Sequence, residues 1–443
     1  MRHVILKLAT TGGKITKIYV QEGARRCKLK GGQAHIVVGL CAEQSKNPVF
    51  FGFDSSSGQE KSIAATIRYM KGCGDEGKGQ SDASMGLVKD YFIKDEGEMK
   101  KLSLADVAKL IETSAVMGVT VLCLQEMLMD QVEWLPISLG NLSNLVTLCL
   151  GENKIMALPT TISCLKSLKK LDIHSNQLIN LPSSFGELSM LSDLDLHDNR
   201  MRSLPTTFGN LSSLINLDIS RNRFSALPET IGNLTNLRML NIENNDMEEL
   251  PQTIGSCSSL LELRANCNTL EALPDTIGDL NSLEILTARY NRIERFPPTM
   301  APFAKLKELD ISFNSLESVP DSLCLVTSLV KLNIGKNFTA LKSLPVSIGN
   351  LELLEELDVS SNQIRALPDS FAMLSNLQVL HADETPLELP PQDIVKLGAQ
   401  EVVRYMAEHV TERDKETRPD NGSCFCFWFL SFCSKQQAEK ASG

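Results

Sequence analysis

The chain has 443 residues, of which 42% are hydrophobic and 22% charged, and its formal net charge at pH 7 is −10. This composition supports a large buried core and excludes fibrous and wholly disordered classes. The acidic balance, with no lysine or arginine run longer than two residues, argues against nucleic acid as a partner. No apolar stretch approaches the roughly 18 residues of a membrane-spanning helix. The N-terminal sequence MRHVILKLATTGGK is a poor secretory signal.

Residues 1–100 carry no repeat and are rich in glycine, serine and lysine. Apolar runs at 36–40 and 49–53 are candidates for short strands, but no periodic face persists, and we expect a poorly ordered segment. Gly72-x-x-x-x-Gly77-Lys78 is spaced like a phosphate-binding loop. However, Gly79 follows where magnesium binding needs Ser or Thr, and residues 62–70 indicate a helix where a strand is required, so we expect no phosphate site.

Residues 101–121 are predicted to form an N-terminal capping helix. Ser103 has the side chain of a helix N-cap, and Leu104, Val107, Ala108 and Ile111 share one helical face. We expect this face to pack on the first coil of the region that follows.

From residue 148 to 367 one pattern occurs ten times, Leu-x-Leu-x-x-Asn-x-Leu-x-x-Leu-Pro. The first nine asparagines are spaced by 23 residues and the last by 25. A fixed period of about 20–29 residues with this pattern is typical of a leucine-rich repeat solenoid. The ten asparagines are Asn153, Asn176, Asn199, Asn222, Asn245, Asn268, Asn291, Asn314, Asn337 and Asn362.

Apolar residues five and three positions before each asparagine predict a short strand whose apolar side chains point inward. The asparagine amide is expected to bond backbone groups of the neighbouring coil, and Leu-Pro fixes an extended turn. One coil cannot bury its leucines alone, so the coils stack. We therefore predict an α/β leucine-rich repeat solenoid over residues 122–390, with about 12 repeats including degenerate ends. Its curved parallel β-sheet would line the concave face, with short helical or irregular convex segments and helical caps.

The C-terminal end of the solenoid is predicted to be closed by a helix. Thr385 stands in the asparagine position of a last, degenerate repeat, and an apolar pattern at helical spacing indicates a capping helix over residues 391–412. Residues 413–443 then form a linker and a cysteine- and aromatic-rich tail, in which Cys424, Cys426 and Cys433 are candidates for lipidation and membrane-surface contact. The alternative is that the tail folds against the last coil or is exposed.

The chain's twelve cysteines are scattered rather than clustered at the ends of the repeat region. Clustered, disulfide-paired cysteines are usual at the caps of extracellular solenoids of this class, so we expect an intracellular, cytoplasmic protein in a reducing compartment.

The outward positions of the predicted strands give the candidate protein-binding residues. An acidic group lies in the first half, and arginine with aromatic residues, a mixture enriched at interface hot spots, lies in the centre. The alternative is that the aspartates are only repeat consensus on a solvated face. The candidates are Arg264, Arg289, Tyr290, Phe313, Glu262, Asp310, Asp195 and Asp198.

His174 and His197 occupy equal positions in adjacent coils, beside Asp172 and Asp195, which makes a divalent metal an alternative use of these residues. Repetition alone produces such pairs, and an open strand face is expected to offer few neighbouring groups that would hydrogen-bond the metal ligands and orient them. We therefore expect no metal, no cofactor and no catalytic residue.

The block from Lys101 to Cys433 resembles the plant intracellular Ras-group-related leucine-rich repeat proteins. Stretches outside the repeat consensus carry the likeness, among them residues 129–136, 286–291 and 332–338, the last with a two-residue insertion. The first 100 residues do not match the family pattern. The resemblance implies a non-catalytic scaffold in intracellular signal transduction.

For partners, the resemblance implies a small GTPase or a kinase or phosphatase bound on the concave face, because animal relatives of this family bind small GTPases and a phosphatase subunit. Two other functions stay open. Residues 1–100 would be a nucleotide-binding or enzymatic module that the solenoid targets, or the tail would make the chain a peripheral membrane organiser at the inner face of the plasma membrane.

Overall fold

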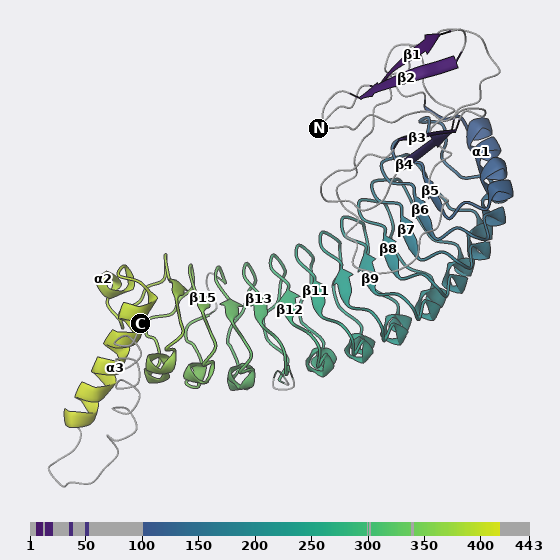
Figure 1. Ribbon diagram of the computed structural model, residues 1–443. Helices are drawn as coiled ribbons and strands as arrows, with labels where there is room; N and C mark the ends of the chain where they lie inside the picture. Colours follow the sequence, from purple (N-terminus) through teal and green to yellow (C-terminus); the bar gives the residue numbers. More distant parts are fainter. Residues whose placement is uncertain are drawn as a thin grey trace. The chain divides into compact units, whose positions relative to one another are not determined.

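The computed structural model describes residues 6–11, 14–20, 35–38, 49–52, 101–298, 300, 303–337 and 341–416. The chain divides into two compact units, Met1–Leu270 and Glu271–Gly443. Within each unit, parallel strands line one side of the repeats and short 3₁₀ turns lie on the other (Figure 1). The predicted leucine-rich repeat fold is therefore confirmed.

Among the described residues of the first unit are a repeat sheet of seven short parallel strands, helix α1 before it, and four strands nearer the N-terminus. Its strands are β1 Leu6–Thr11, β2 Lys14–Val20, β3 His35–Val38, β4 Val49–Gly52, β5 Val121–Cys123, β6 Thr147–Cys149, β7 Lys170–Asp172, β8 Asp193–Asp195, β9 Asn216–Asp218, β10 Met239–Asn241 and β11 Glu262–Arg264, and α1 is Leu104–Met117. Its 3₁₀ turns are Ile137–Asn141, Thr160–Cys164, Ser183–Glu187, Thr206–Asn210, Glu229–Asn233 and Gln252–Ser256.

In the part of the second unit that the structure describes, there are five more strands of the same kind and two helices. Its elements are β12 Ile285–Thr287, β13 Glu308–Asp310, β14 Lys331–Asn333, β15 Glu356–Asp358, β16 Val379–His381, α2 Gln392–Val395 and α3 Ala399–Glu416. Its 3₁₀ turns are Asp275–Asp279, Asp321–Leu325, Ile348–Asn350 and Asp369–Met373.

The 23-residue period places equivalent residues side by side on adjacent strands. In the first unit Leu171 of β7 pairs with Leu194 of β8, and Leu194 pairs with Leu217 of β9. These central leucines are buried, whereas their strand neighbours are partly exposed, as alternation along a strand requires. The inward positions therefore form one continuous apolar column through each unit, as the sequence pattern predicts.

The repeated asparagines join one coil to the next. The amide of Asn176 donates to the carbonyls of Leu150, Ile173 and His174, and its Oδ1 accepts from the backbone N–H of Ile155. At the last strand the hydroxyl of Thr385 donates to the Val359 carbonyl at 3.1 Å. Both predicted roles, of the asparagines and of Thr385, are confirmed. The bonds satisfy backbone groups that the turn leaves unpaired.

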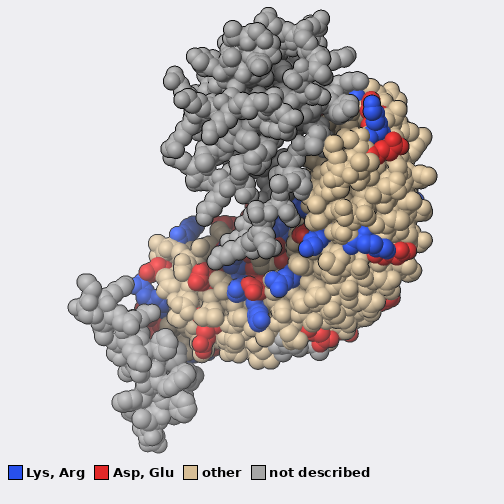
Figure 2. All heavy atoms as spheres, turned by 45° about the vertical axis from the view of Figure 1, so that its right-hand side comes forward, with Lys and Arg blue, Asp and Glu red and all other residues tan. Residues whose placement is uncertain are grey.

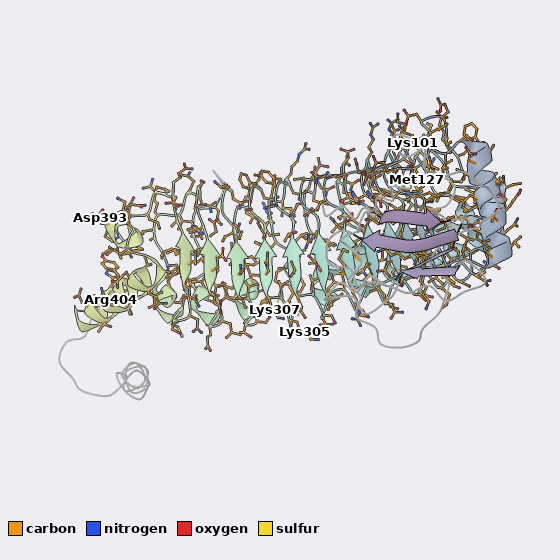
Figure 3. The ribbon with its side chains drawn as sticks, turned by 45° about the horizontal axis from the view of Figure 1, so that its top comes forward. Lys101, Met127, Lys305, Lys307, Asp393 and Arg404 are labelled. Carbon is orange, nitrogen blue, oxygen red and sulfur yellow. The ribbon has the colours of Figure 1, made fainter. Side chains whose placement is uncertain are left out.

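Helix α1 begins at the predicted cap. Ser103 Oγ accepts from the N–H of Asp106, and the Asp106 carboxylate accepts from the N–H of Ser103, which is a capping box. The helix buries Val107 and Ile111. The residue before the cap is tied to the first coil, because the N–H of Leu102 donates to the Met127 carbonyl at 2.7 Å. Figure 3 shows Lys101 and Met127 along the same edge of this unit.

The C-terminal cap differs from the single helix expected over 391–412. It consists of the short α2 and the longer α3, separated at Gly398, whose φ of 107° is not helical. Figure 3 shows Asp393 on α2 and Arg404 on α3. Helix α3 packs on the turn Asp369–Met373 and buries Val402 and Met406. The break arises because glycine adopts positive φ without a steric penalty.

Within residues 1–100 the structure describes four strands. β3 pairs antiparallel with β4, so both candidate apolar runs contain strands. β1 pairs antiparallel with β2, a hairpin that the sequence analysis did not predict. The remaining residues of this segment, including the Gly72–Gly79 stretch and the helix expected at 62–70, lie outside the described residues, as do Cys424, Cys426 and Cys433.

Candidate functional site

The strand face, defined here as the outward side chains on and just after strands β5–β16, has three positions in each coil. They lie four, two and one residue before the repeat asparagine. At the last position every coil has a non-glycine residue with positive φ, among them Asp198 at 55°, Tyr290 at 57° and Phe313 at 53°. The conformation lets the N–H at this position reach the next coil, as in the 3.1 Å bond from Tyr290 to the Ser312 carbonyl. A left-handed backbone costs roughly 1–2 kcal/mol in a residue with a Cβ.

The aspartates four before the asparagine hold the backbone of their own coil. Asp195 Oδ1 accepts from the N–H of His197 at 3.0 Å, and Asp310 Oδ1 accepts from the N–H of Ser312 at 3.0 Å. The hydroxyl of Ser312 also donates to Asp310, at 2.6 Å. This local role supports the consensus alternative for Asp195 and Asp310, whose part in partner binding stays a prediction. Asp198 accepts from the hydroxyl of Ser175 at 2.9 Å.

Two histidines of the first unit stack on the strand face. The rings of His174 and His197 lie 4.8 Å apart and within 5° of parallel. Nδ1 of His174 is 2.5 Å from Asp172 Oδ1, and Nδ1 of His197 is 2.7 Å from Asp195 Oδ1. These carboxylates raise the pKa of His174 and of His197 above the usual value, against an opposing effect of partial burial. One ligand atom from each of His174, Asp195 and His197 lies within 4.8 Å of the others.

Strand β11 carries two further predicted residues, which the structure brings together. Arg264 Nε donates to Glu262 Oε1 at 2.5 Å, and the Glu262 carboxylate raises the pKa of the Arg264 guanidinium. The Arg264 side chain remains 49% exposed. Arg264 therefore presents a positive charge that is oriented by its neighbour on the strand and still accessible to a partner.

In the second unit, predicted aromatic residues stack on one another. The rings of Tyr290 and Phe313 are 4.0 Å apart with an interplanar angle of 19°. Lys336 Nζ lies 5.3 Å from the centre of the Phe313 ring. Phe313 thus contacts an aromatic ring and a cation, while Tyr290 is 47% exposed and Arg289 is exposed. The sequence analysis omitted Lys336 from the site, although it occupies the same repeat position as both rings.

A cysteine pair was also missed. Cys123 of β5 pairs in register with Cys149 of β6, and both thiols are partly exposed. Hydrogen bonding with Cys123, together with burial, raises the pKa of the Cys149 thiol. The available signal was their shared position, because both cysteines stand at the strand position that aspartate takes in Asp172 and Asp195.

Away from the strand face, charges of opposite sign lie beside one another. Lys154 and Asp130 approach to 2.8 Å, and Arg295 and Glu317 to 3.1 Å, each pair joining neighbouring coils. Figure 2 shows the same mixing of basic and acidic side chains over the described surface that it presents. Such exposed pairs contribute little stability, because water and salt screen the two charges. No helix in the described part of the chain combines the length and apolarity needed to cross a bilayer.

Comparison with known proteins places these features in a family. A family model described as leucine-rich repeat region matches residues 105–223 and 215–338, and a second leucine-rich repeat model matches 353–374. Plant intracellular Ras-group-related LRR protein 4 of Oryza sativa subsp. japonica is 52% identical over 93 residues, which are 21% of this chain and 16% of that protein. The predicted resemblance is confirmed over such stretches, which span only 11% to 16% of the curated relatives' lengths.

Solved structures share the fold. A leucine-rich repeat protein of Leptospira interrogans has a TM-score of 0.51 at 30% sequence identity, and the match covers 62% of this chain and 74% of that one. The PEPR1–AtPEP1 structure has a TM-score of 0.52 at 27% identity, covering 57% of this chain and 37% of that chain. A leucine-rich repeat fold of this kind is suited to protein–protein interaction.

Proposed function

We propose that this chain, which belongs to the leucine-rich repeat family, is a non-catalytic scaffold that binds a protein partner through its strand face. The observation that carries the proposal is the stack of Tyr290 on Phe313 in the second unit, with Tyr290 about half exposed. Both residues occupy left-handed backbone positions, where a bulky ring is sterically costly. Partner binding gives a reason for large aromatic side chains at such positions, because exposed aromatic anchors provide much of the energy of protein interfaces.

Charged residues beside these rings fit the rim of such an interface. Arg289 is exposed next to Tyr290, and Lys336 lies over Phe313. Within the first unit taken by itself, Arg264 and Glu262 form an oriented ion pair, and Asp198 accepts a hydrogen bond from Ser175. Complementary charge on a partner would set its orientation and speed its association. Asp195 and Asp310 accept hydrogen bonds from the backbone of their own coil, so the proposal rests on the aromatic and basic residues rather than on these aspartates.

The partner class follows from similarity. The relatives carry "Ras-group-related" in their names. We therefore infer that the partner is a signalling protein, either a Ras-type small GTPase or an associated kinase or phosphatase. The relatives are named intracellular, and the thiols of Cys149, Cys164, Cys257, Cys267 and Cys324 fit a reducing, cytoplasmic setting.

A paired set of variants tests the proposal. The double variant Tyr290→Ala/Phe313→Ala should lower recovery of the partner in quantitative capture from cells, with a loss of affinity of about 30-fold if the pair contributes roughly 2 kcal/mol. Leu353→Ala is the matched control, because Leu353 is an apolar residue of the same unit, 53% exposed, on the segment that follows the turn Ile348–Asn350. Unchanged recovery with the double variant would remove this patch from the interface.

The partner class needs its own measurement. The purified 443-residue chain would be titrated with a Ras-type GTPase in its GTP-analogue and GDP forms. Tighter binding of one form is expected because signalling scaffolds distinguish the states of their GTPase. Equal, negligible binding of both forms would redirect the proposal to a kinase or phosphatase from the capture experiment.

Two alternatives rest on the sequence outside the described residues. A chain ending at Asp420 would lose membrane association if Cys424, Cys426 and Cys433 anchor the protein, and fractionation would show the loss. Nucleotide binding by residues 1–100 would appear as a nucleotide-dependent shift in the thermal stability of the chain, and the absence of a shift would remove this alternative.

A further inference from the structure

The stacked histidines of the first unit form a cross-strand pair. Asp172 of β7 pairs in register with Asp195 of β8, so His174 and His197, two residues further along, lie side by side. Their ring centres are 4.8 Å apart, and their planes differ by 5°. Because the rings are parallel and each directs Nδ1 to its own aspartate, the two Nε2 atoms are presented in the same sense.

The aspartates determine which nitrogen is available. A carboxylate only accepts hydrogen bonds, so the contacts of 2.5 Å and 2.7 Å place the proton of each neutral imidazole on Nδ1. Nε2 of each ring then carries a lone pair. This carboxylate–histidine arrangement orients histidines in metal sites and raises their basicity as ligands. The structure thus supplies the outer-shell partners that the sequence analysis did not expect on an open face.

A third ligand lies next to Nε2 of His174. Glu152 Oε1 is 3.8 Å from this nitrogen, too far for a hydrogen bond, and it accepts from the amide of Gln125 at 2.7 Å. Two bonds of about 2.1 Å to a shared cation span a separation of this size. Negative charge also surrounds the site, because the carboxylates of Asp172, Asp195 and Glu152 all lie near His174.

Space for His174 depends on the preceding coil. Gly151 occupies the equivalent position there, and a Cβ on it would lie 2.4 Å from Cε1 of His174. The absence of a side chain lets the ring lie close to the backbone, where it is only 16% exposed, while His197 is 30% exposed. The pair is therefore sheltered by the protein and still reachable from solvent.

We propose that His174 and His197 bind one divalent transition cation of the Zn²⁺ type through Nε2, with the Glu152 carboxylate as third protein ligand and water completing the coordination. Imidazole and carboxylate are the donors that such borderline cations accept. Asp172 and Asp195 act as positioning residues. Because the rings are now parallel, they must tilt toward one another for both Nε2 lone pairs to point at one cation. The site lies wholly in the first unit, so it is independent of the aromatic patch in the proposed function.

Residue-specific protection tests the site in the whole 443-residue chain. Zn²⁺ alone is added, and histidines are modified with diethyl pyrocarbonate and mapped by mass spectrometry. Modification of His174 and His197 should slow at least tenfold, while the exposed His381 on β16 reacts at the same rate with and without the metal. This readout does not respond to zinc bound by cysteines elsewhere. Unchanged rates at His174 and His197 would overturn the proposal.

Affinity measurements then identify the ligands. By calorimetry with Zn²⁺, His174→Asn and His197→Asn should each weaken one binding event at least tenfold, and Asp172→Asn should weaken it less while leaving the number of sites unchanged. His381→Asn is the matched control and should bind like the parent. Equal affinity of parent and both histidine variants would also overturn the site, and the protection experiment on the parent chain stands even if a variant fails to fold.

Discussion

The side-chain oxygen of Asn199 accepts a hydrogen bond from the backbone N–H of Leu178, 21 residues earlier, at 2.9 Å. The amide nitrogen of the same residue donates to the carbonyls of Ile173, Leu196 and His197. One side chain, 8% exposed, thus satisfies four backbone groups in two successive coils. The asparagine therefore stabilises the stacking of coils as well as the turn within its own coil.

Replacing Asn199 with aspartate should destabilise the first unit by about 2–4 kcal/mol, because an aspartate accepts from Leu178 but cannot donate to the three carbonyls. The free energy of unfolding would be measured by urea titration. Asn210→Asp, on the exposed end of the turn Thr206–Asn210, is the control and should change stability by less than about 0.5 kcal/mol. Equal effects at the two positions would contradict the bridging role.

The cap of α1 gives a second prediction. Ser103→Ala removes the acceptor for the Asp106 N–H and should cost about 1 kcal/mol, whereas Ser103→Asn keeps an N-cap acceptor and should be close to neutral. Hydrogen exchange of the α1 amides, compared with amides of β9, would locate the effect. Similar losses for both variants would show that Ser103 acts through something other than capping.

The left-handed position of Tyr290 predicts an unusual order of stabilities. Tyr290→Gly should be about 1 kcal/mol more stable than Tyr290→Ala, because glycine adopts a φ of 57° without a steric penalty. At Ile285, within strand β12, the same two substitutions should rank in the opposite order. Urea titration of the four variants measures both differences, and the same ranking at the two sites would contradict the strain argument.

Burial predicts which thiols react. Burial raises the pKa of Cys257 to about 11, so only about 0.1% of it is thiolate at pH 8. Iodoacetamide should modify the exposed Cys164 and Cys267 in the native chain and reach Cys257 only after unfolding. Peptide mapping over time measures the rates. Rapid native modification of Cys257 would show that the coil opens readily at this point.

Periodicity predicted most of the repeat fold because one spacing fixes three things. The burial of Leu171 and Ile173, the bond from Asn176 to the neighbouring coil and the substitution of Thr385 for asparagine all follow from where these residues fall in the repeat. The break at Gly398 was missed because an apolar helical pattern continues across it, and the backbone conformation of a single glycine decides the outcome.

The candidate site was less predictable. The sequence placed Tyr290 and Phe313 at the same position of adjacent repeats. Their stacking depends on side-chain rotamers, which periodicity does not specify. Lys336 and the pair Cys123–Cys149 occupy the same repeat positions as other strand-face residues. Their residue types alone did not mark them as part of a site. The left-handed φ of the residue before each asparagine could not be predicted from the sequence for a different reason. The residue types there show no preference for glycine, because hydrogen bonding to the next coil imposes the conformation.

The hydrogen bonds of Asn199 reach back 26 residues to Ile173 and no further. Contacts of this range involve only the coil before and the coil after. The first coils of a growing polypeptide can therefore fold before its C-terminal end has been synthesised. Each coil emerging from the ribosome can dock on the one already formed, and translation itself would then set the order in which the solenoid is assembled.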